Sequence, residues 1–260
     1  MSLHLQYAKE RRHDVLAVTR RPIGCAALAV MTVFGFASSA VAQQASLPVL
    51  ERIDRDRLCV TNGAVSVLAD GRLAIETPSS RAVVQAGTEN GADQTAEIRF
   101  RYLGPSRDSR PLASGELRRQ IGLKLQAEDG CNLIYAMWRI EPEAKVAVSI
   151  KRNAGLHTSQ QCGARGYVNF KSQDRSGPLP IRPGEAHTLR AELHGKDLTV
   201  TADGKVAWQG PLASETGLTV GPPGFRTDNA RFTFEYFAAV PSRTGAPPGG
   251  RGQCVVSEGD

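Results

Sequence analysis

The sequence predicts an all-β protein, an antiparallel two-sheet β-sandwich of the jelly-roll type. Apolar and polar side chains alternate over residues 187–193 and again over 198–203, which is the period of a strand with one buried face. Turn residues such as Asp203-Gly204 recur about every 8–12 residues. After residue 42, no segment of ten or more residues has a helical period, which argues against alternating βαβ units.

The first 42 residues are predicted to be a signal peptide. Basic residues precede a short apolar run at 23–36, and Ala40-Val41-Ala42 offers small residues at the −3 and −1 positions of a cleavage site. The run is shorter than the roughly 20 residues that cross a bilayer, so no integral membrane segment is expected in the mature chain. An uncleaved N-terminal anchor is the alternative. The expected organisation is a signal peptide at 1–42, an arm at 43–56, the sandwich at 57–240 and a Pro/Gly-rich tail at 241–260.

Charge gives little support for a nucleic-acid partner. The leader holds five of the 32 Lys and Arg and two of the 26 Asp and Glu, so 27 and 24 remain and the mature net charge is +3. No basic stripe interleaved with aromatic residues is present.

Four cysteines remain after the leader. An even number behind a signal peptide predicts two disulfides and an oxidising compartment, the periplasm or the medium. Three pairings are possible. We favour Cys131–Cys162, which joins neighbouring central segments, and Cys59–Cys254, which ties the first strand to the last segment.

The first half of the chain is expected to hold short strands. They are predicted at 58–61, 64–68, 72–77, 81–86 and 95–103, with hairpin turns at Asn62-Gly63 and Asp70-Gly71. Residues 104–115 form a polar loop. Alternation then predicts strands around 121–125, 131–140 and 146–150, and the second of these is apolar on both faces.

The second half continues the pattern. Residues 156–164 are expected as a polar loop and 166–171 as a strand, followed by strands at 187–193, 198–202 and 205–208. Gly221-Pro222-Pro223-Gly224 is a link to a closing aromatic strand at 230–240, in which Phe232, Phe234 and Tyr236 share one face.

This order resembles the concanavalin A-like lectin/glucanase superfamily, including laminin-G-like jelly-roll modules of exported bacterial proteins. The resemblance covers about residues 95–240 and is carried by Gly184, His187, Leu189, Gly195, Leu198, Val200, Asp203, Gly204 and residues 231–237. It implies two antiparallel sheets with one concave face that often holds glycans, sometimes beside a calcium ion. The Glu-x-Asp-x-x-Glu strand of the glucanase branch does not occur, which weakens the case for retaining glycoside hydrolysis.

No catalytic residue is assigned from the sequence. There is no Gly-x-Ser-x-Gly motif, and His157, His187 and His194 are scattered; a structural role fits His187, whose register turns it inward. No metal ligand set is assigned and no cofactor is expected, although calcium remains possible. Its candidate oxygen ligands are Glu89, Asn90 and Asp93, or Asp228 and Asn229.

The best candidates for ligand binding are Tyr135, Arg139 and Lys151. An aromatic face stacks on a sugar ring, and Arg or Lys binds hydroxyls or uronate carboxylates. Alternation places Tyr135 and Arg139 on one face and Trp138 on the other, so Trp138 is expected in the core.

The leading functional hypothesis is an exported, non-catalytic domain that binds glycan or cell-envelope material. Two alternatives stay open. One is a polysaccharide-cleaving lyase or glycosidase with an unrecognised site, for example a lyase that uses Tyr135 and His157. The other is a purely structural envelope protein, which would have a small, filled and apolar concave face.

Overall fold

The computed structural model describes residues 49–85, 93–172, 180–212, 220–239 and 254. All described elements belong to one compact unit that spans residues 46–260. The predicted signal peptide, the tail except Cys254, and the candidate ligands Glu89 and Asn90 lie outside the described residues.

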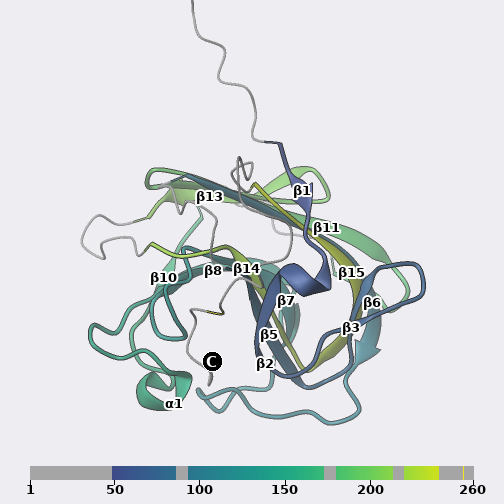
Figure 1. Ribbon diagram of the computed structural model, residues 1–260. Helices are drawn as coiled ribbons and strands as arrows, with labels where there is room; N and C mark the ends of the chain where they lie inside the picture. Colours follow the sequence, from purple (N-terminus) through teal and green to yellow (C-terminus); the bar gives the residue numbers. More distant parts are fainter. Residues whose placement is uncertain (1–48, 86–92, 173–179, 213–219, 240–253, 255–260) are drawn as a thin grey trace, which may run out of the picture. The chain divides into compact units, whose positions relative to one another are not determined.

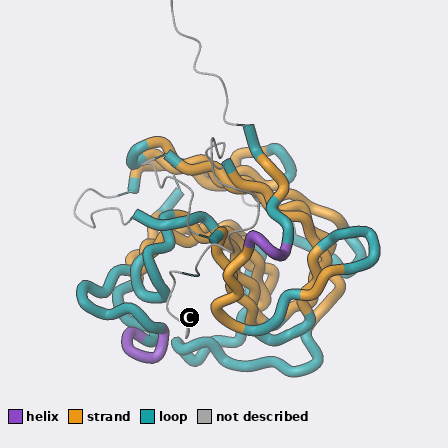
Figure 2. The backbone as a smooth tube through the Cα atoms, in the orientation of Figure 1, coloured by secondary structure: helices purple, strands orange, loops and turns teal. Residues whose placement is uncertain are grey.

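The described strands form two antiparallel sheets that lie face to face, as the sequence predicts (Figures 1 and 2). The eight-stranded sheet has the order β13-β12-β11-β6-β15-β4-β3, and β1 pairs with β15. Its strands are β1 (Glu51–Arg52), β3 (Ser66–Val67), β4 (Leu73–Ile75), β6 (Gln94–Pro105), β11 (Ala186–His194), β12 (Asp197–Ala202), β13 (Lys205–Pro211) and β15 (Ala230–Ala238).

The seven-stranded sheet has the order β10-β9-β8-β7-β14-β5-β2. Its strands are β2 (Leu58–Asn62), β5 (Ser79–Val84), β7 (Arg119–Leu125), β8 (Leu133–Glu141), β9 (Lys145–Lys151), β10 (Tyr167–Phe170) and β14 (Gly224–Asp228). Two short helices complete the described elements, a 3-10 turn at Arg55–Arg57 and α1 at Ser159–Cys162.

The core lies between the two sheets. Leu189, Val200 and Phe234 of the eight-stranded sheet are at most 1% exposed and share one interior. The seven-stranded sheet contributes Trp138 and Phe225, and the Phe225 ring lies 5.0 Å from that of Phe234. Each large apolar side chain buried in this way contributes roughly 1.5–3 kcal/mol. The placement of Trp138 in the core is therefore confirmed.

Turn chemistry predicts some connections and misassigns one. Asp203 and Gly204 both have positive φ, 51° and 75°, and join β12 to β13 as expected for an Asp-Gly hairpin. The hairpin predicted at Asn62-Gly63 is wrong, because β2 pairs with β5 whereas β3 pairs with β4 in the other sheet. The chain crosses between the sheets at this turn.

The main strand that the sequence analysis omits is β14. It follows the Gly-Pro-Pro-Gly link and lies between β5 and β7 in the seven-stranded sheet. Phe225 points into the core, and Arg226 and Asp228 point to the opposite face. The predicted loop at 156–164 likewise contains α1, whose first turn is closed by a capping box between Thr158 and Gln161.

The described part of the expected N-terminal arm packs on the sandwich. Glu51 and Arg52 pair with β15, and Ile53 is 1% exposed. The structure joins Cys59 to Cys254 and Cys131 to Cys162, which is the pairing favoured from the sequence. Among the described residues, no helix has the length and apolar character needed to cross a membrane.

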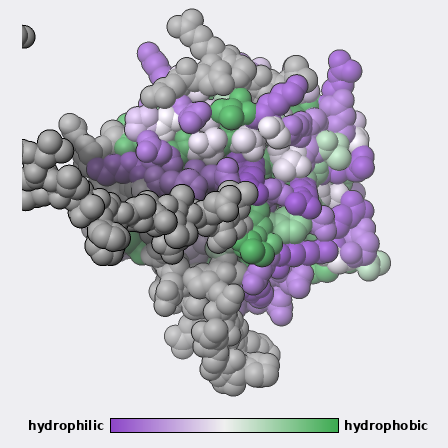
Figure 3. Space-filling model, turned by 90° about the horizontal axis from the view of Figure 1, so that it is seen from above, coloured by the Kyte–Doolittle hydropathy of each residue, from purple (hydrophilic) through white to green (hydrophobic). Residues whose placement is uncertain are grey.

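The outer face of the eight-stranded sheet carries matched charges. Glu97 accepts ion pairs from Arg99 at 2.6 Å and Arg190 at 3.5 Å, and Arg190 also reaches Glu192 at 2.6 Å. Seen from above, the described part of the molecule is mostly hydrophilic (Figure 3). On this face Arg99 and Arg190 are thus neutralised by neighbouring carboxylates.

Candidate functional site

A groove of about 620 Å³ lies on the face of the seven-stranded sheet that points away from the core. Its floor consists of outward side chains of β8, β9, β10 and β14. Its rims are residues 110–114 and 118 on one side, and residues 159, 163 and 164 beside α1 on the other. The two polar loops expected at 104–115 and 156–164 therefore border this face and leave it open.

A stacked pair of tyrosines forms part of the groove. The rings of Tyr135 on β8 and Tyr167 on β10 are 6.1 Å apart and 21° from parallel. Tyr135 is 3% exposed, whereas Tyr167 is 37% exposed. The Arg226 guanidinium lies 5.2 Å from the Tyr135 ring centre, and the Lys151 ammonium lies 5.3 Å from that of Tyr167. Tyr167 is thus the aromatic surface that the groove presents, and Tyr135 supports it.

The Tyr167 hydroxyl stays protonated at neutral pH. Desolvation raises the pKa of Tyr167 to about 12, and the neighbouring Tyr135 adds to the effect. The hydroxyl lies 3.5 Å from Nη1 of Arg226, which donates to it. The phenol therefore remains available as a hydrogen-bond donor to a ligand oxygen.

A buried ion pair fixes the centre of the floor. Arg226 Nε donates to Asp228 Oδ2 at 2.8 Å and Nη2 donates to Oδ1 at 3.2 Å. Gln120 Nε2 donates to the same carboxylate at 2.6 Å. Burial, the largest single effect, would raise the pKa of Asp228, but the Arg226 charge together with the hydrogen bonds from Arg226 and Gln120 outweighs burial and holds the pKa below its ordinary value. Arg226 is thereby oriented and neutralised within the fold.

Asn229 ties the first rim to the sheet. Its side chain accepts from Arg110 N at 2.7 Å and donates to Arg110 O at 2.8 Å and to Arg118 O at 3.0 Å. Asn229 is 2% exposed and has φ of 53°, a conformation that Asn tolerates. Both ends of the rim segment are therefore held at one point.

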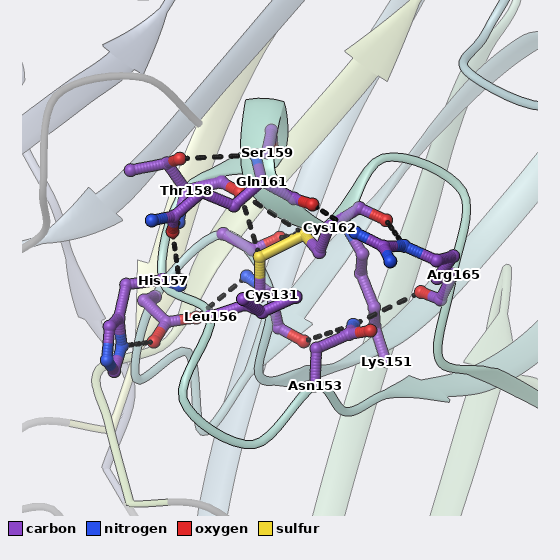
Figure 4. Close-up of a disulfide and its surroundings, with 12 residues drawn as sticks. Cys131, Lys151, Asn153, Leu156, His157, Thr158, Ser159, Gln161, Cys162 and Arg165 are labelled. Carbon is purple, nitrogen blue, oxygen red and sulfur yellow. Dashed lines mark hydrogen bonds and ion pairs between the residues drawn. A yellow bond between two sulfur atoms is a disulfide. The ribbon is translucent and has the colours of Figure 1, made fainter.

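The Cys131–Cys162 disulfide ties the second rim to the segment just before β8 (Figure 4). Lys151 Nζ donates to Gly130 O at 3.0 Å beside it. Asp129, 4% exposed, accepts from Cys131 N at 2.7 Å and from His157 Nδ1 at 2.7 Å. The disulfide and these hydrogen bonds hold the loop that ends in α1 against the sheet.

Cations outnumber carboxylates in the groove. Among the described lining residues, the only carboxylate is Asp228. Six cationic side chains line the same space: Arg81, Arg110, Arg118, Arg139, Lys151 and Arg226. Only Arg226 is paired with Asp228, and Arg118 pairs with Glu116 outside the lining.

All three binding residues proposed from the sequence line this groove, with different exposure. Tyr135 and Lys151 are each 3% exposed and support the floor from below. Arg139 is half-buried, and its Nε has no hydrogen-bond partner among the described residues. Arg139 is therefore the member of the trio that is free to contact a ligand.

Sequence reasoning missed Arg226, Asp228 as its partner, Gln120 and Tyr167 as groove residues. Arg226 and Asp228 alternate with Phe225 and Thr227, which is a strand period. Pro222 and Pro223 precede this short run and favour its interpretation as part of a link. Tyr167 lies on a strand that the sequence predicts, but nothing local indicates that it stacks on Tyr135.

The other candidate residues lie away from the groove or are used within the fold. His157 is not among the groove-lining residues. His187 bonds Asp203 at 2.8 Å beside a smaller hollow of about 260 Å³. The side chains of Asp228 and Asn229 bond neighbouring groups as described above, and no cluster of three or more His, Cys, Asp or Glu within the described ranges could hold a metal ion.

Several solved structures are similar to this two-sheet antiparallel sandwich. They include the carbohydrate binding module CBM66 from Bacillus subtilis, with 14% identity over 68% of this chain and 91% of that chain and a TM-score of 0.48. The potassium-bound Emp46p carbohydrate recognition domain has 15% identity over 70% and 88%, with a TM-score of 0.45. Alginate lyase AlyC3 has 11% identity over 65% and 75%, with a TM-score of 0.41.

Identity to these three structures is at most 15% and none of the three TM-scores reaches 0.5, so no function follows from the likenesses. No protein-family profile matches the chain, and no curated protein matches it. Function is therefore argued from the groove itself.

Proposed function

We propose that the protein is an exported, non-catalytic module that binds a glycan in the groove of the seven-stranded sheet. The observation that carries the proposal is an open groove of about 620 Å³ in which Tyr167, 37% exposed, stands on Tyr135. The apolar face of a sugar ring stacks on an aromatic ring of this kind. Arg139 and Gln120 lie at the same surface to bond ring substituents.

The supporting groups are held before any ligand arrives. Tyr135 backs Tyr167, Lys151 lies over the Tyr167 ring, and Asp228 fixes Arg226. A site whose side chains are already ordered loses less conformational entropy on binding. The partner we propose is a polysaccharide or a cell-envelope glycan, met in the periplasm or the medium, where two disulfides form readily.

Affinity electrophoresis of the purified protein through a panel of neutral and acidic polysaccharides tests the proposal. We expect retardation by at least one polysaccharide, and Tyr167→Ala should weaken that binding roughly tenfold through loss of the stacking surface. Val168→Ala is the matched control, because Val168 is exposed on the same strand but does not line the groove. No retardation by any polysaccharide, or equal binding by Tyr167→Ala, would contradict the proposal.

The two alternatives fit the groove less well. A lyase built on Tyr135 and His157 would need both groups at one ligand, but His157 does not line the groove and its ring bonds Asp129. A purely structural protein would have a small, filled, apolar face, whereas this face is hollow and lined by cations. Release of new reducing ends or unsaturated sugars from a retained polysaccharide would overturn the non-catalytic part of the proposal.

A further inference from the structure

The charge of the groove is uncompensated on one side of its floor. On the eight-stranded sheet, Arg99 and Arg190 have carboxylate partners within 2.6 Å. In the groove, Arg226 has Asp228, but Arg139 and Arg110 have no carboxylate partner among the described residues. Arginines left without a counter-charge in a hollow favour an anionic ligand.

Arg139 and Gln120 are neighbours in this region. They are paired in register on β8 and β7, and both line the groove. Gln120 is 3% exposed; its Nε2 is used by Asp228, and its buried Oε1 has no hydrogen-bond partner in the described part of the chain. The buried Nε of Arg139 is also unpartnered there. A buried polar atom without a partner destabilises the free protein, and a ligand that supplies the missing hydrogen bond removes that cost.

The rim adds charge above this pair. Arg110 and Arg118 belong to the segment that Asn229 holds against the sheet. Burial lowers the pKa of Arg139, and the positive charge of Arg118 lowers it further. Arg139 stays protonated at neutral pH, because a guanidinium is not deprotonated in proteins. Glu116 and Glu143 favour its charged form from a distance, but no carboxylate of the described residues pairs with it directly.

The other groove cations have partners. Lys151 donates to the carbonyl of Gly130. Arg81 Nη1 donates to Ser159 Oγ at 3.4 Å, although the buried Nε of Arg81 has no hydrogen-bond partner among the described residues. Arg226 is held by Asp228. Arg118 on the rim pairs with Glu116. Among the described lining residues, the guanidinium groups with neither a carboxylate partner nor a side-chain hydrogen bond to the protein are therefore those of Arg139 and Arg110.

We infer that Arg139, with Arg110 on the rim of the same groove, forms a subsite for the carboxylate of a uronic acid residue. A carboxylate accepts two parallel hydrogen bonds from a guanidinium, in a bidentate pair. An ionised carboxylate has no hydrogen-bond donor to offer Gln120 Oε1. A hydroxyl of the same sugar donates to that oxygen instead. A ligand that carries a carboxylate beside hydroxyls meets both requirements, and a simple anion meets only one. This inference rests on the proposed glycan-binding function and specifies its ligand as an acidic polysaccharide.

The test compares polygalacturonate with its fully methyl-esterified form, which keeps the hydroxyls and lacks the charge. We expect the protein to bind polygalacturonate at least tenfold more tightly. Arg139→Gln should remove most of this preference. Arg139→Lys should retain only part of it, because an ammonium cannot form a bidentate pair with a carboxylate. If Arg139→Gln unfolds, Arg110→Gln at an exposed rim position is measured instead, and it should also reduce the preference for polygalacturonate.

Arg182→Gln is the charge-matched control, since Arg182 is exposed and lies outside the groove lining. Binding to dextran sulfate is measured in parallel, to compare a polysaccharide whose negative charges are not carboxylates. Equal affinity for dextran sulfate, or equal losses in Arg182→Gln and Arg139→Gln, would show general charge attraction and overturn the inference.

The inference and the proposed function fail in different ways. If both pectin forms bind equally and Tyr167→Ala weakens both, the glycan site stands and the uronate subsite is wrong. If neither polygalacturonate, nor its methyl ester, nor any other polysaccharide is bound, both the proposed function and the uronate subsite are wrong.

Discussion

The side chain of Asn229 forms two hydrogen bonds with the backbone of Arg110, accepting from its N–H at 2.7 Å and donating to its carbonyl at 2.8 Å. The two residues are 119 positions apart. Asn229 stands at the corner between β14 and β15. The last two strands of the fold therefore determine where one rim of the groove lies.

We expect Asn229→Ala to release that rim. The substitution removes three hydrogen bonds from a side chain that is 2% exposed, and Ala is disfavoured at φ of 53°. The free energy of unfolding should fall by about 2–4 kcal/mol, and amide exchange at 110–118 should accelerate. Urea unfolding and hydrogen exchange measure these changes. Asn169→Ala, at the groove edge, is the control, and unchanged protection at 110–118 would refute the anchoring role.

Asp228→Asn should destabilise the protein by about 3–5 kcal/mol, because it leaves Arg226 buried and without a counter-charge. Asn keeps the size of the side chain, so the loss reports charge. Chemical denaturation at pH 7 gives the value. The exposed Asp108→Asn should change stability by less than about 0.5 kcal/mol, and a similar value for both variants would show that the ion pair is unimportant.

The same pair predicts an acid-dependent stability. Burial opposes ionisation of Asp228, but Arg226 holds its pKa below the ordinary value of 3.8. The ionised pair thus stabilises the folded state at all pH values above about 4, and this contribution is lost as pH falls through the folded pKa. Unfolding curves between pH 2 and pH 7 should show a steeper acid loss for the wild type than for Asp228→Asn. Parallel profiles would contradict the prediction.

Removal of the Cys131–Cys162 disulfide should cost about 3–4 kcal/mol in the chain-entropy treatment, given a sequence separation of 31. Cys59–Cys254 spans 195 positions, so its removal should cost about 5 kcal/mol. The paired Ser variants, compared by thermal and urea unfolding, test this order. Glycan affinity should fall more in the Cys131/Cys162 variant, because that bridge supports α1 and the second rim. A reversed order of binding loss would count against this assignment.

Gly122→Ala should destabilise the centre of the seven-stranded sheet by about 1–3 kcal/mol. An added Cβ would lie 2.4 Å from the carbonyl oxygen of Ala136 and 2.6 Å from Met137 Sδ. The backbone contact cannot be relieved by a rotamer change. Ser149→Ala, on the same face of β9, is the control, with an expected change below about 0.5 kcal/mol. A neutral Gly122→Ala variant would show that the strands separate easily here.

Much of the fold could be predicted because its strands alternate cleanly. Leu189, Val200 and Phe234 share one interior, as their period of two predicts. The failure at Asn62-Gly63 has a physical cause, since Asn-Gly specifies a local bend and says nothing about which strands pair after it. In the structure the next two strands belong to different sheets.

The site was predictable only in part. Tyr135 and Arg139 share a face of one strand, so alternation alone places them together. Arg226 and Tyr167 join them through pairing between strands that are far apart in the sequence, which no local pattern encodes. The unpartnered Gln120 Oε1 also emerges only when Asp228 is seen to occupy the amide nitrogen.

The position of β14 has a consequence for how the protein is made. Residues 224–228 fill the space between β5 and β7, so the half-sheet formed by β2 and β5 stays separate from the half-sheet formed by β7 to β10 until they insert. In a nascent chain that ends before residue 224, the edges of β5 and β7 that pair with β14 are still unpaired. Assembly of the groove floor must therefore wait until residues 224–228 have been synthesised, long after the strands on either side of them.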